Sequence, residues 1–305
     1  MTSRLMLLDT ASLYFRAFYG VPDTVRSADG TPVNAVRGLL DIIAKLVTTY
    51  EPSHIVACWD DDWRPQWRVD LIPSYKSHRV VEVVAGGPDV EEVPDPLEVQ
   101  VPIIREALAT LGIATVGAAQ HEADDVIGTL ATRATQPVDI VTGDRDLFQL
   151  IDDARDIRVI YTARGMSNLE TITDEVVFAK YGVHAAQYAD FATLRGDTSD
   201  GLPGVKGVGE KTAATLLAAH GDLAGIRAAV ERGEGMSAAV RAKFAAASDY
   251  LDVAPKVVAV ASDLDLGEFD ATLPRPDEAA IARATEFAGR WSLGTSMDRV
   301  LAALA

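Results

Sequence analysis

The sequence predicts an α/β fold with a mainly parallel central sheet flanked by helices, followed by a helical subdomain. Three observations support this prediction. Short apolar runs, typical of strands buried on both faces, alternate with segments of helical periodicity. Three of these runs end directly at acidic residues or at a Gly-Asp pair. From about residue 173 onward, the hydrophobic pattern is helical.

Residues 1–172 form the predicted α/β domain. Its strands are expected at residues 5–8, 55–59 and 138–142, and its helices at residues 35–49, 97–111 and 124–134. Strand–helix alternation is the pattern of parallel sheets. Ligands of such sheets bind beside the carboxyl ends of the strands. We therefore expect the functional residues directly after these strands.

Residues 75–98 interrupt the alternation. The segment is basic at its start and acidic afterwards, and it contains Gly86-Gly87 and the prolines Pro88, Pro94 and Pro96. This composition predicts a flexible insertion at the mouth of the site rather than a core element.

Residues 173–305 form the predicted helical subdomain and a C-terminal return segment. Residues 256–261 are expected to return to the edge of the sheet, and residues 277–305 to close the chain as a helical tail.

The composition excludes several classes of protein. The single cysteine, Cys58, rules out a disulfide framework and a cysteine zinc site. No apolar run reaches the roughly 18 residues of a membrane span, and the N-terminal apolar stretch is too short for a signal peptide. We therefore expect a cytoplasmic protein. The net charge of −17 is only weak evidence against a nucleic-acid partner, because a local basic track matters more than the total.

The most informative feature is a set of nine acidic residues in five clusters, each placed where a strand ends or where a helix or turn begins. They are Asp9; Asp60; Glu122, Asp124 and Asp125; Asp144 and Asp146; and Asp197 and Asp200. Carboxylates repel one another and rarely gather unless cations neutralise them. An oxygen-only set suits Mg²⁺ or Mn²⁺ rather than zinc. Two such ions about 3.5–4 Å apart would make a site for phosphoryl transfer or phosphodiester hydrolysis.

Each cluster alone has a simpler explanation. Asp9 could cap a helix, and the acids at 122–125 could be favourable charges at a helix N-terminus. Asp60 is followed by two further aspartates, and we choose Asp60 because it directly ends the strand. Five clusters within one α/β pattern are hard to explain as caps, so the pattern favours a metal site.

A glycine-rich loop follows the last acidic cluster. Its glycines allow a tight turn whose backbone N–H groups point outward at the start of a helix near Glu210, which is typical of a phosphate site. Such contacts position a duplex without identifying its sequence. An ordinary turn between helices is the simpler alternative. The predicted DNA-binding residues of the loop are Gly204, Lys206, Gly207, Gly209, Lys211 and Thr212.

Five motifs together resemble the bacterial 5′-nuclease family, the flap endonucleases. They are LLDT, YKSHR, EADDVIGTLA, TGDRDLFQL and GDTSDGLPGVKGVGEKTA. The family includes the N-terminal 5′-nuclease domain of bacterial DNA polymerase I and free-standing paralogues, and the resemblance covers nearly the whole chain. No polymerase domain follows in this sequence, so a stand-alone enzyme is expected. The resemblance implies a PIN-like α/β nuclease fold with a helical arch at about residues 75–98 and a helix–three-turn–helix subdomain.

The resemblance also implies roles for individual residues. All nine acidic positions match the metal-ligand pattern of the family, with two or more Mg²⁺ or Mn²⁺ ions. Lys76, Arg79 and Arg16 would stabilise charge on the scissile phosphate as catalytic residues, and Tyr75 would stack on the unpaired end base. The backbone carbonyls of Val205 and Val208 would hold a K⁺ that bridges to a DNA phosphate.

The implied function is a monomeric nuclease of DNA replication and repair. Its substrates would be DNA with 5′ flaps, nicks, gaps or 5′ ends, RNA–DNA hybrids included, and no membrane is involved. Three alternatives remain open: a PIN-type ribonuclease, a non-catalytic protein that binds DNA junctions, and a metal-dependent phosphatase of small substrates.

Overall fold

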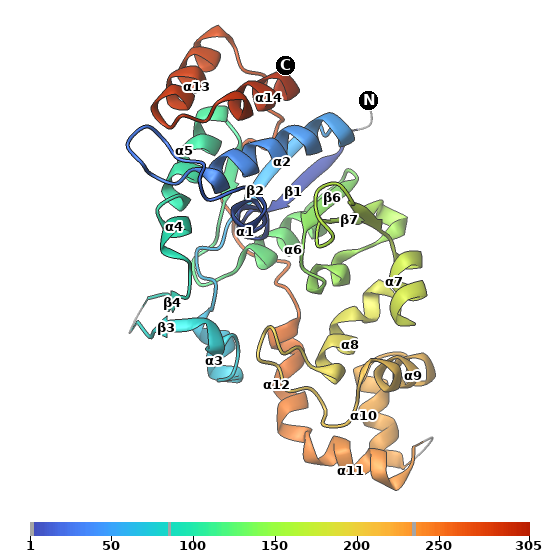
Figure 1. Ribbon diagram of the computed structural model, residues 1–305. Helices are drawn as coiled ribbons and strands as arrows, with labels where there is room; N and C mark the ends of the chain where they lie inside the picture. The colour runs from blue at the N-terminus through green and yellow to red at the C-terminus, as the bar shows by residue number, and fades with distance from the viewer. Residues whose placement is uncertain (1–2, 85–86, 234–235) are drawn as a thin grey trace.

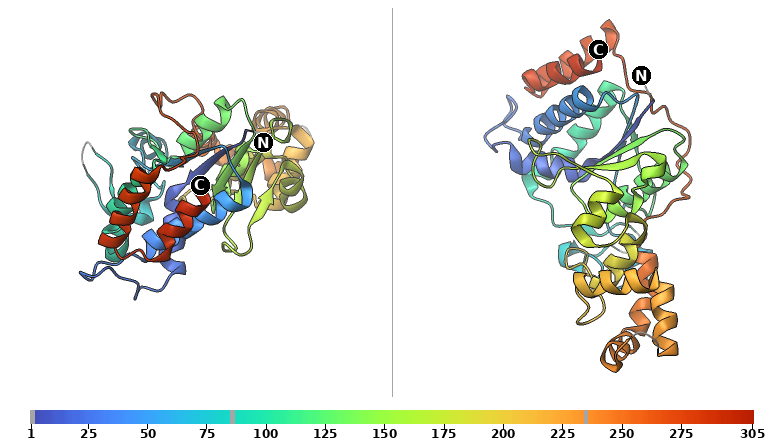
Figure 2. Two further views of the ribbon diagram at one scale, coloured as in Figure 1. Left: turned by 90° about the horizontal axis from the view of Figure 1, so that it is seen from above. Right: turned by 90° about the vertical axis from the view of Figure 1, so that its right-hand side faces the viewer.

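The computed structural model describes residues 3–84, 87–233 and 236–305, so Gly86 of the predicted insertion lies outside the described residues. A six-stranded sheet with helices on both faces forms the upper part of the molecule in Figure 1, and a group of helices forms the lower part. Figure 2 shows the same division from the side. The predicted α/β class with a mostly parallel sheet is therefore confirmed.

The sheet places the ends of its central strands at one edge. Its order is β5-β2-β1-β6-β7-β8, and all neighbours are parallel except β7 and β8. Leu5 is in register with His54 on one side and Val138 on the other, so β1, β2 and β6 end at nearly the same level. The strands are β1 (Leu5–Asp9), β2 (His54–Cys58), β5 (Ala114–Val116), β6 (Val138–Thr142), β7 (Ile157–Tyr161) and β8 (Glu170–Ile172).

Two apolar cores cover the two faces of the sheet. Met6 and Leu8 of β1 lie in one core and Leu5 and Leu7 in the other, as the alternation of side chains along a strand requires. The first core contains α1 (Thr10–Gly20), α2 (Asn34–Tyr50), α5 (Val101–Leu111), α13 (Glu278–Arg290) and α14 (Thr295–Leu304). The second contains α6 (Ala123–Arg133) and η2 (Asp146–Leu150) and continues into the helices of the lower part.

The insertion at residues 75–98 is not the helical arch that the resemblance implies. After the short helix α3 (Gln66–Leu71), the described residues form a 3₁₀ turn η1 (Ser77–Arg79), an antiparallel pair β3 (Val80–Glu82) and β4 (Val90–Glu91), and the single turn α4 (Asp95–Glu98). The physical reason lies in the sequence, because β-branched valines favour strands and closely spaced prolines prevent a long helix.

The lower part consists of short helices. They are α7 (Asp174–Tyr181), η4 (Ala185–Gln187), α8 (Tyr188–Arg195), α9 (Glu210–His220), α10 (Leu223–Arg232), α11 (Ala238–Ala246) and α12 (Ser248–Val258). A further 3₁₀ turn, η3 (Asp153–Arg155), precedes β7 of the sheet. The glycine-rich loop joins α8 to α9.

The expected return of residues 256–261 to the sheet is wrong, because α12 continues to Val258. The return occurs later in the chain. Ile55 N donates to Ala271 O at 2.8 Å, and Leu273 N donates to Ser53 O at 2.9 Å. Residues 271–273 therefore lie along β2, and α13 and α14 follow them back to the upper part.

In the part of the chain that the structure describes, none of the helices combines the length and apolar character needed to cross a bilayer.

Candidate metal centre

Asp9 is held where β1 passes into α1. It is the last residue of the strand and caps the helix, since its Oδ1 accepts a hydrogen bond from Ser12 N at 3.2 Å. Its Oδ2 accepts a hydrogen bond from Thr142 Oγ1 at 2.6 Å, which links it to the end of β6. The helix cap that the sequence offers as an alternative is therefore present, and it points the carboxylate to the carboxyl edge of the sheet.

The neighbouring strands bring further carboxylates to the same edge. Asp60 follows β2, and its Oδ1 accepts a hydrogen bond from Ala123 N at 2.7 Å, at the start of α6. Glu122 caps α6 and Asp124 lies in its first turn. Asp144 follows β6, and its backbone N donates to Thr142 Oγ1 at 2.8 Å.

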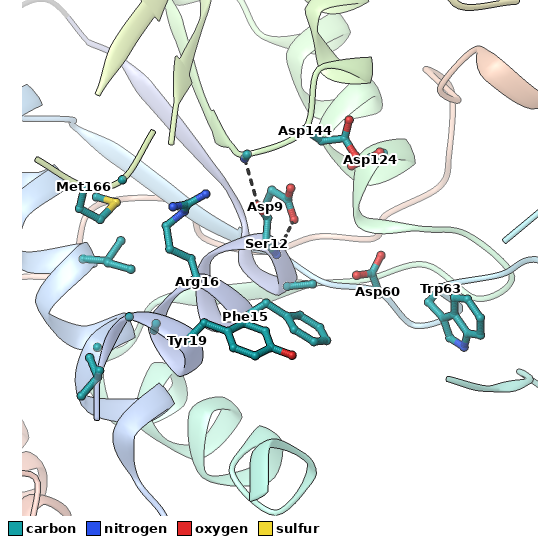
Figure 3. Close-up of a pocket in the computed structure, with 18 of the residues that line it drawn as sticks. Asp9, Ser12, Phe15, Arg16, Tyr19, Asp60, Trp63, Asp124, Asp144 and Met166 are labelled. Carbon is teal, nitrogen blue, oxygen red and sulfur yellow. Dashed lines mark hydrogen bonds between the residues drawn. The ribbon is translucent and has the colours of Figure 1, made fainter. Parts of the chain in front are cut away.

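These five acids line one cavity of about 1020 Å³. In Figure 3, Asp9, Asp60, Asp124 and Asp144 lie around one end of it, and Arg16 lies toward the other end. The predicted catalytic residues Lys76, Arg79 and Arg16 line the same cavity, as do Phe15, Tyr19, Trp63 and Glu91. Phe15 and Tyr19 were not predicted. Tyr19 lies three residues after the predicted Arg16 on α1, so the two share one face of the helix. This helical spacing is the sequence signal that could have identified Tyr19.

Crowding of negative charge is visible in the pKa values. Burial, followed by the charges of Asp60 and Asp144, raises the pKa of Asp9 to about 7. Burial also raises the pKa of Asp124 well above its ordinary value, and the charges of Asp9, Asp144 and Glu122 add to the effect. Such carboxylates resist ionisation until a cation neutralises them.

The other acids lie outside the cavity lining. Burial raises the pKa of Asp146 well above its ordinary value, and the charges of Asp144, Asp200 and Asp197 raise it further, so these four are electrostatic neighbours. Asp197 accepts hydrogen bonds from Ser199 N at 2.8 Å and from Arg195 at 3.2 Å. Despite its burial, these donors lower the pKa of Asp197.

Asp125 also lies outside the cavity lining, and its carboxylate is bound by other groups of the protein. It is fully buried, and the guanidinium of Arg68 donates to both of its oxygens, at 2.7 and 2.8 Å. Oδ1 also accepts from Ala261 N at 2.8 Å, and Oδ2 accepts from Glu122 N at 3.2 Å. Both oxygens are thus occupied. The bond from Glu122 N is that of a capping box, in which the third helical residue points back toward the cap.

Tyr75 is buried beside Glu122. Its side chain is only 3% exposed, and its hydroxyl donates to Glu122 Oε1 at 2.7 Å. The ring is buried in this structure, and its stacking on an unpaired base stays a prediction. Lys76 Nζ lies 2.5 Å from the other oxygen, Glu122 Oε2. Burial alone would lower the pKa of Lys76, but Glu122, Tyr75 and Asp200 together outweigh it, and the pKa lies well above its ordinary value.

Arg79 and Arg16 differ in their surroundings. Arg79 donates to Ser199 O at 3.0 Å and lies 3.6 Å from Asp200 Oδ1, so it contacts the loop of the last acidic cluster. Arg16 lines the cavity, and its buried Nε has no hydrogen-bond partner among the described residues. Arg16 is therefore available to an anion that enters the cavity.

The glycine-rich loop has the tight backbone that the sequence predicts. Gly201, Gly204 and Gly207 have positive φ angles of 69°, 65° and 78°. Gly209 caps α9, and Lys206 and Lys211 are exposed beside it. The carbonyl of Val205 accepts a hydrogen bond from Val208 N at 2.8 Å, and Lys243 Nζ donates to Gly207 O at 2.8 Å.

The chemistry of the donors fits hard divalent cations. The set consists of carboxylates, which suit Mg²⁺ and Mn²⁺. Within the described ranges, no three acidic, histidine or cysteine side chains lie close enough to hold one ion in common. The fit therefore depends on the oxygen donors and on the raised pKa values, both of which indicate a need for positive charge.

Raising the pH is expected to destabilise the metal-free protein. Below about pH 4 Asp9 holds its proton in both the folded and the unfolded state. Between its ordinary pKa of 3.8 and its folded value of about 7, only the folded state keeps the proton, so stability falls as the pH rises through this window. Melting temperatures in EDTA from pH 5 to 8 would measure this, with Asp9→Asn as the control that flattens the slope. Added Mg²⁺ should reduce this loss of stability. A melting temperature that responds neither to pH nor to Mg²⁺ would contradict the prediction.

Carboxylates at the carboxyl ends of parallel strands, with lysine and arginine beside them, define the class of α/β enzymes that bind phosphate esters with divalent cations. The family comparison specifies the class further. Residues 4–182 match the model described as "5'-3' exonuclease, N-terminal resolvase-like domain", and residues 183–279 match "5'-3' exonuclease, C-terminal SAM fold". The chain belongs to the 5′-3′ exonuclease family and is a 5′-3′ exonuclease by class.

Individual relatives agree with this assignment. A 5′-3′ exonuclease of Streptomyces coelicolor is 59% identical over 301 residues, which cover 98% of this chain and 99% of the relative. DNA polymerase I of Mycobacterium bovis is 43% identical over 223 residues, which cover 72% of this chain and 23% of the polymerase. The predicted resemblance to the nuclease part of DNA polymerase I is thus confirmed.

A solved structure shows the same fold. The bacteriophage T5 flap endonuclease, crystallised as a pseudo-enzyme-product complex with DNA and metal ions, aligns with a TM-score of 0.63 and 14% identity, covering 99% of each chain. At this identity the likeness supports the fold alone, including the helical C-terminal part.

Proposed function

We propose that the chain is a structure-specific 5′-nuclease that hydrolyses DNA phosphodiesters with divalent cations in replication and repair. Its substrates would be 5′ flaps, nicks, gaps and free 5′ ends, with RNA–DNA hybrids included. The observation that carries this proposal is that five of the nine predicted acids line one cavity together with Lys76, Arg79 and Arg16.

The cations would be two or more Mg²⁺ or Mn²⁺ ions. Asp9, Asp60, Glu122, Asp124 and Asp144 would hold the ions of the cavity, and Asp146, Asp197 and Asp200 would hold an outer ion. When bound, such ions supply a water of lowered pKa and stabilise the leaving oxygen. Asp125 acts differently, because its oxygens are occupied by Arg68.

The basic residues of the cavity would position the scissile phosphate. Arg16 has an unpaired Nε and would bind a phosphate oxygen directly. Lys76 and Arg79 would add positive charge as negative charge develops on the phosphorus oxygens. Both are tied to acids of the site, Lys76 to Glu122 and Arg79 to Asp200, so their positions follow those of the ligands.

The glycine-rich loop would bind the duplex through its backbone. The N–H groups at the start of α9 and the exposed Lys206 and Lys211 form a positive surface that suits a phosphate. The carbonyls of Val205 and Val208 would hold a K⁺ that bridges to this phosphate. We further propose a monomeric, cytoplasmic enzyme built of two units, residues 1–172 and 173–305.

Removing both loop lysines is expected to weaken binding without changing the chemistry. Lys206→Ala with Lys211→Ala should raise the Kd for nicked duplex, and the slope of log K against log salt should fall by about two units at most. Cleavage at saturating DNA should be little changed. Anisotropy titrations between 50 and 200 mM salt, roughly the range in which such contacts matter, would measure this. An unchanged slope would mean that the duplex binds elsewhere.

The function itself is tested by cleavage of a 5′-end-labelled flap duplex. Mg²⁺ or Mn²⁺ is compared with EDTA, and single-stranded DNA and RNA serve as further substrates. Incision at the flap junction that requires metal supports the proposal. Preference for RNA would favour a PIN-type ribonuclease, and binding without incision would indicate a DNA-junction protein.

A further inference from the structure

Arg68 is a buried arginine that the predicted mechanism does not use. It lies on α3, is 2% exposed, and contacts three separate parts of the chain. Its Nε donates to Val257 O on α12 at 3.1 Å. Its two terminal nitrogens bind the carboxylate of Asp125, and Nη1 also lies 3.2 Å from Glu122 Oε1.

A buried guanidinium is costly unless it is paired and hydrogen-bonded. Here each of its three nitrogens donates at least one hydrogen bond, and two of the bonds form a parallel pair to one carboxylate. This bidentate geometry fixes the relative orientation of both groups, which a lysine ammonium does not do. The arrangement is therefore rigid, and its hydrogen bonds offset the cost of burying the guanidinium.

Asp125 extends the connection. Its Oδ1 also accepts from Ala261 N at 2.8 Å, three residues beyond the end of α12. Arg68 and Asp125 together thus join the start of α6, which carries Glu122 and Asp124, to the segment that leaves the helical lower part of the molecule. Neither residue of the pair lines the acidic cavity, but both contact Glu122, which does.

Glu122 is the cavity acid that this pair holds. Its Oε1 accepts from Tyr75 at 2.7 Å and faces Arg68, and its Oε2 faces Lys76. If Arg68 were absent, Asp125 would be a buried, unpaired carboxylate close to Glu122. Either the start of α6 would then have to move, or one of these two carboxylates would have to take up a proton.

We propose that Arg68 and Asp125 form a buried positioning pair that anchors Glu122 against α12 and thereby sets the affinity of the acidic cavity for divalent cations. This inference rests on the proposed metal-dependent function. It assigns Asp125 an indirect role, in which the residue orients a ligand rather than contacting the ion.

The pair predicts a specific order of metal affinities. Loss of a partner that orients a ligand typically costs 10–100-fold in metal affinity or activity. Arg68→Met should therefore lower the affinity for Mn²⁺ by about 10–100-fold. Arg68→Lys keeps the charge but loses the bidentate bonds, so it should fall between Arg68→Met and the unchanged protein. Asp125→Asn should weaken Mn²⁺ binding in the same direction as Arg68→Met.

The test is Mn²⁺ binding to the whole chain in the absence of DNA. Calorimetry and the electron paramagnetic resonance signal of free Mn²⁺ measure this binding. The matched control is Arg105→Met. Arg105 is half exposed, lies 3.0 Å from Asp61 and does not line the cavity. Thermal melting in EDTA establishes that each variant is folded, and cleavage is measured over a Mg²⁺ titration. For Arg68→Met, the Mg²⁺ concentration for half-maximal rate should rise, while the rate at saturating Mg²⁺ largely recovers.

Two results would overturn the inference. A folded Arg68→Met variant that binds Mn²⁺ as the unchanged protein does would remove the role of Arg68. Weakened binding in Asp125→Asn alone, with normal binding in both Arg68 variants, would make Asp125 a direct ligand. If Arg68→Met does not fold, Arg68→Lys and Asp125→Asn carry the same comparison. Failure of the proposed function is distinguishable, because the unchanged protein would then neither bind Mn²⁺ nor cleave DNA.

Discussion

Replacing Asp124 with asparagine is expected to abolish cleavage. The rate should fall by about 1,000-fold or more, which corresponds to about 4 kcal/mol of lost transition-state stabilisation. Asp124 lies in the first turn of α6, lines the cavity, and has a pKa raised by burial and by the charges of Asp9, Asp144 and Glu122. An amide of the same shape removes one charge from the ligand set without removing bulk. Affinity for the duplex should persist, because the glycine-rich loop is unchanged.

The same substitution should stabilise the metal-free protein at pH 8. It removes a carboxylate that repels its neighbours, so its melting temperature in EDTA should rise while Mg²⁺ no longer adds stability. Asp61→Asn is the matched control, since Asp61 is an exposed acid next to Asp60 that contacts Arg105 and does not line the cavity. Single-turnover cleavage and anisotropy would measure both effects. Near-normal cleavage by Asp124→Asn would remove it from the proposed ligand set.

Replacing Gly201 with alanine is expected to damage both stability and cleavage. Gly201 has a φ of +69°, and a Cβ there would lie 2.0 Å from Ser74 O. The loop is close to the insertion at this point, since Ser74 Oγ donates to Gly201 O at 2.7 Å and Lys76 N donates to Asp200 O at 3.0 Å. A methyl group must separate the two segments. We expect a cost of about 1–2 kcal/mol for the backbone conformation and about 1–3 kcal/mol for the overlap. Cleavage should fall by about 100-fold, because Asp200 and Lys76 would move apart.

A Gly221→Ala variant separates the cost of the backbone conformation from the cost of the overlap with Ser74. Gly221 also has a positive φ, +87°, but a Cβ there would meet nothing within 4 Å. It should therefore lose stability through its backbone conformation alone and keep its cleavage rate. Chemical denaturation and single-turnover kinetics of both variants give the comparison. Equal losses in the two variants would show that the close approach to Ser74 has no energetic consequence.

Much of the sheet and of the site could be predicted from local sequence. The apolar runs that end at Asp9 and Asp60 identified two central strands and the edge of the sheet where carboxylates gather. Strands β5, β7 and β8 were not predicted. In β5 and β8, three residues give too short a pattern to distinguish from a loop. The helical arch was wrong because it came from resemblance alone. The valines and prolines of this chain favour a short β-hairpin in its place.

The orientation of single side chains was beyond the sequence. Asp124 and Asp125 are adjacent in the chain, yet one lines the cavity and the other binds Arg68. Their difference depends on a partner 57 residues away. The same holds for Tyr75, whose motif suggests a contact with DNA and whose ring is buried beside Glu122. Such pairings are decided by packing between distant segments, which no local pattern contains.

The position of the last two helices has a consequence for how this protein is made. Helix α14 packs on α2, and the side chains of Met297, Val300 and Leu304 are buried there. At about 5–20 residues per second, tens of seconds of synthesis separate the two helices. Until then, the apolar outer face of α2 has no permanent cover, although the sheet beneath it can already form. We therefore expect the nascent chain to expose this apolar face for longer than its early strands would suggest. A chain that ends shortly before α13 would keep every acid of the cavity and still be prone to aggregation.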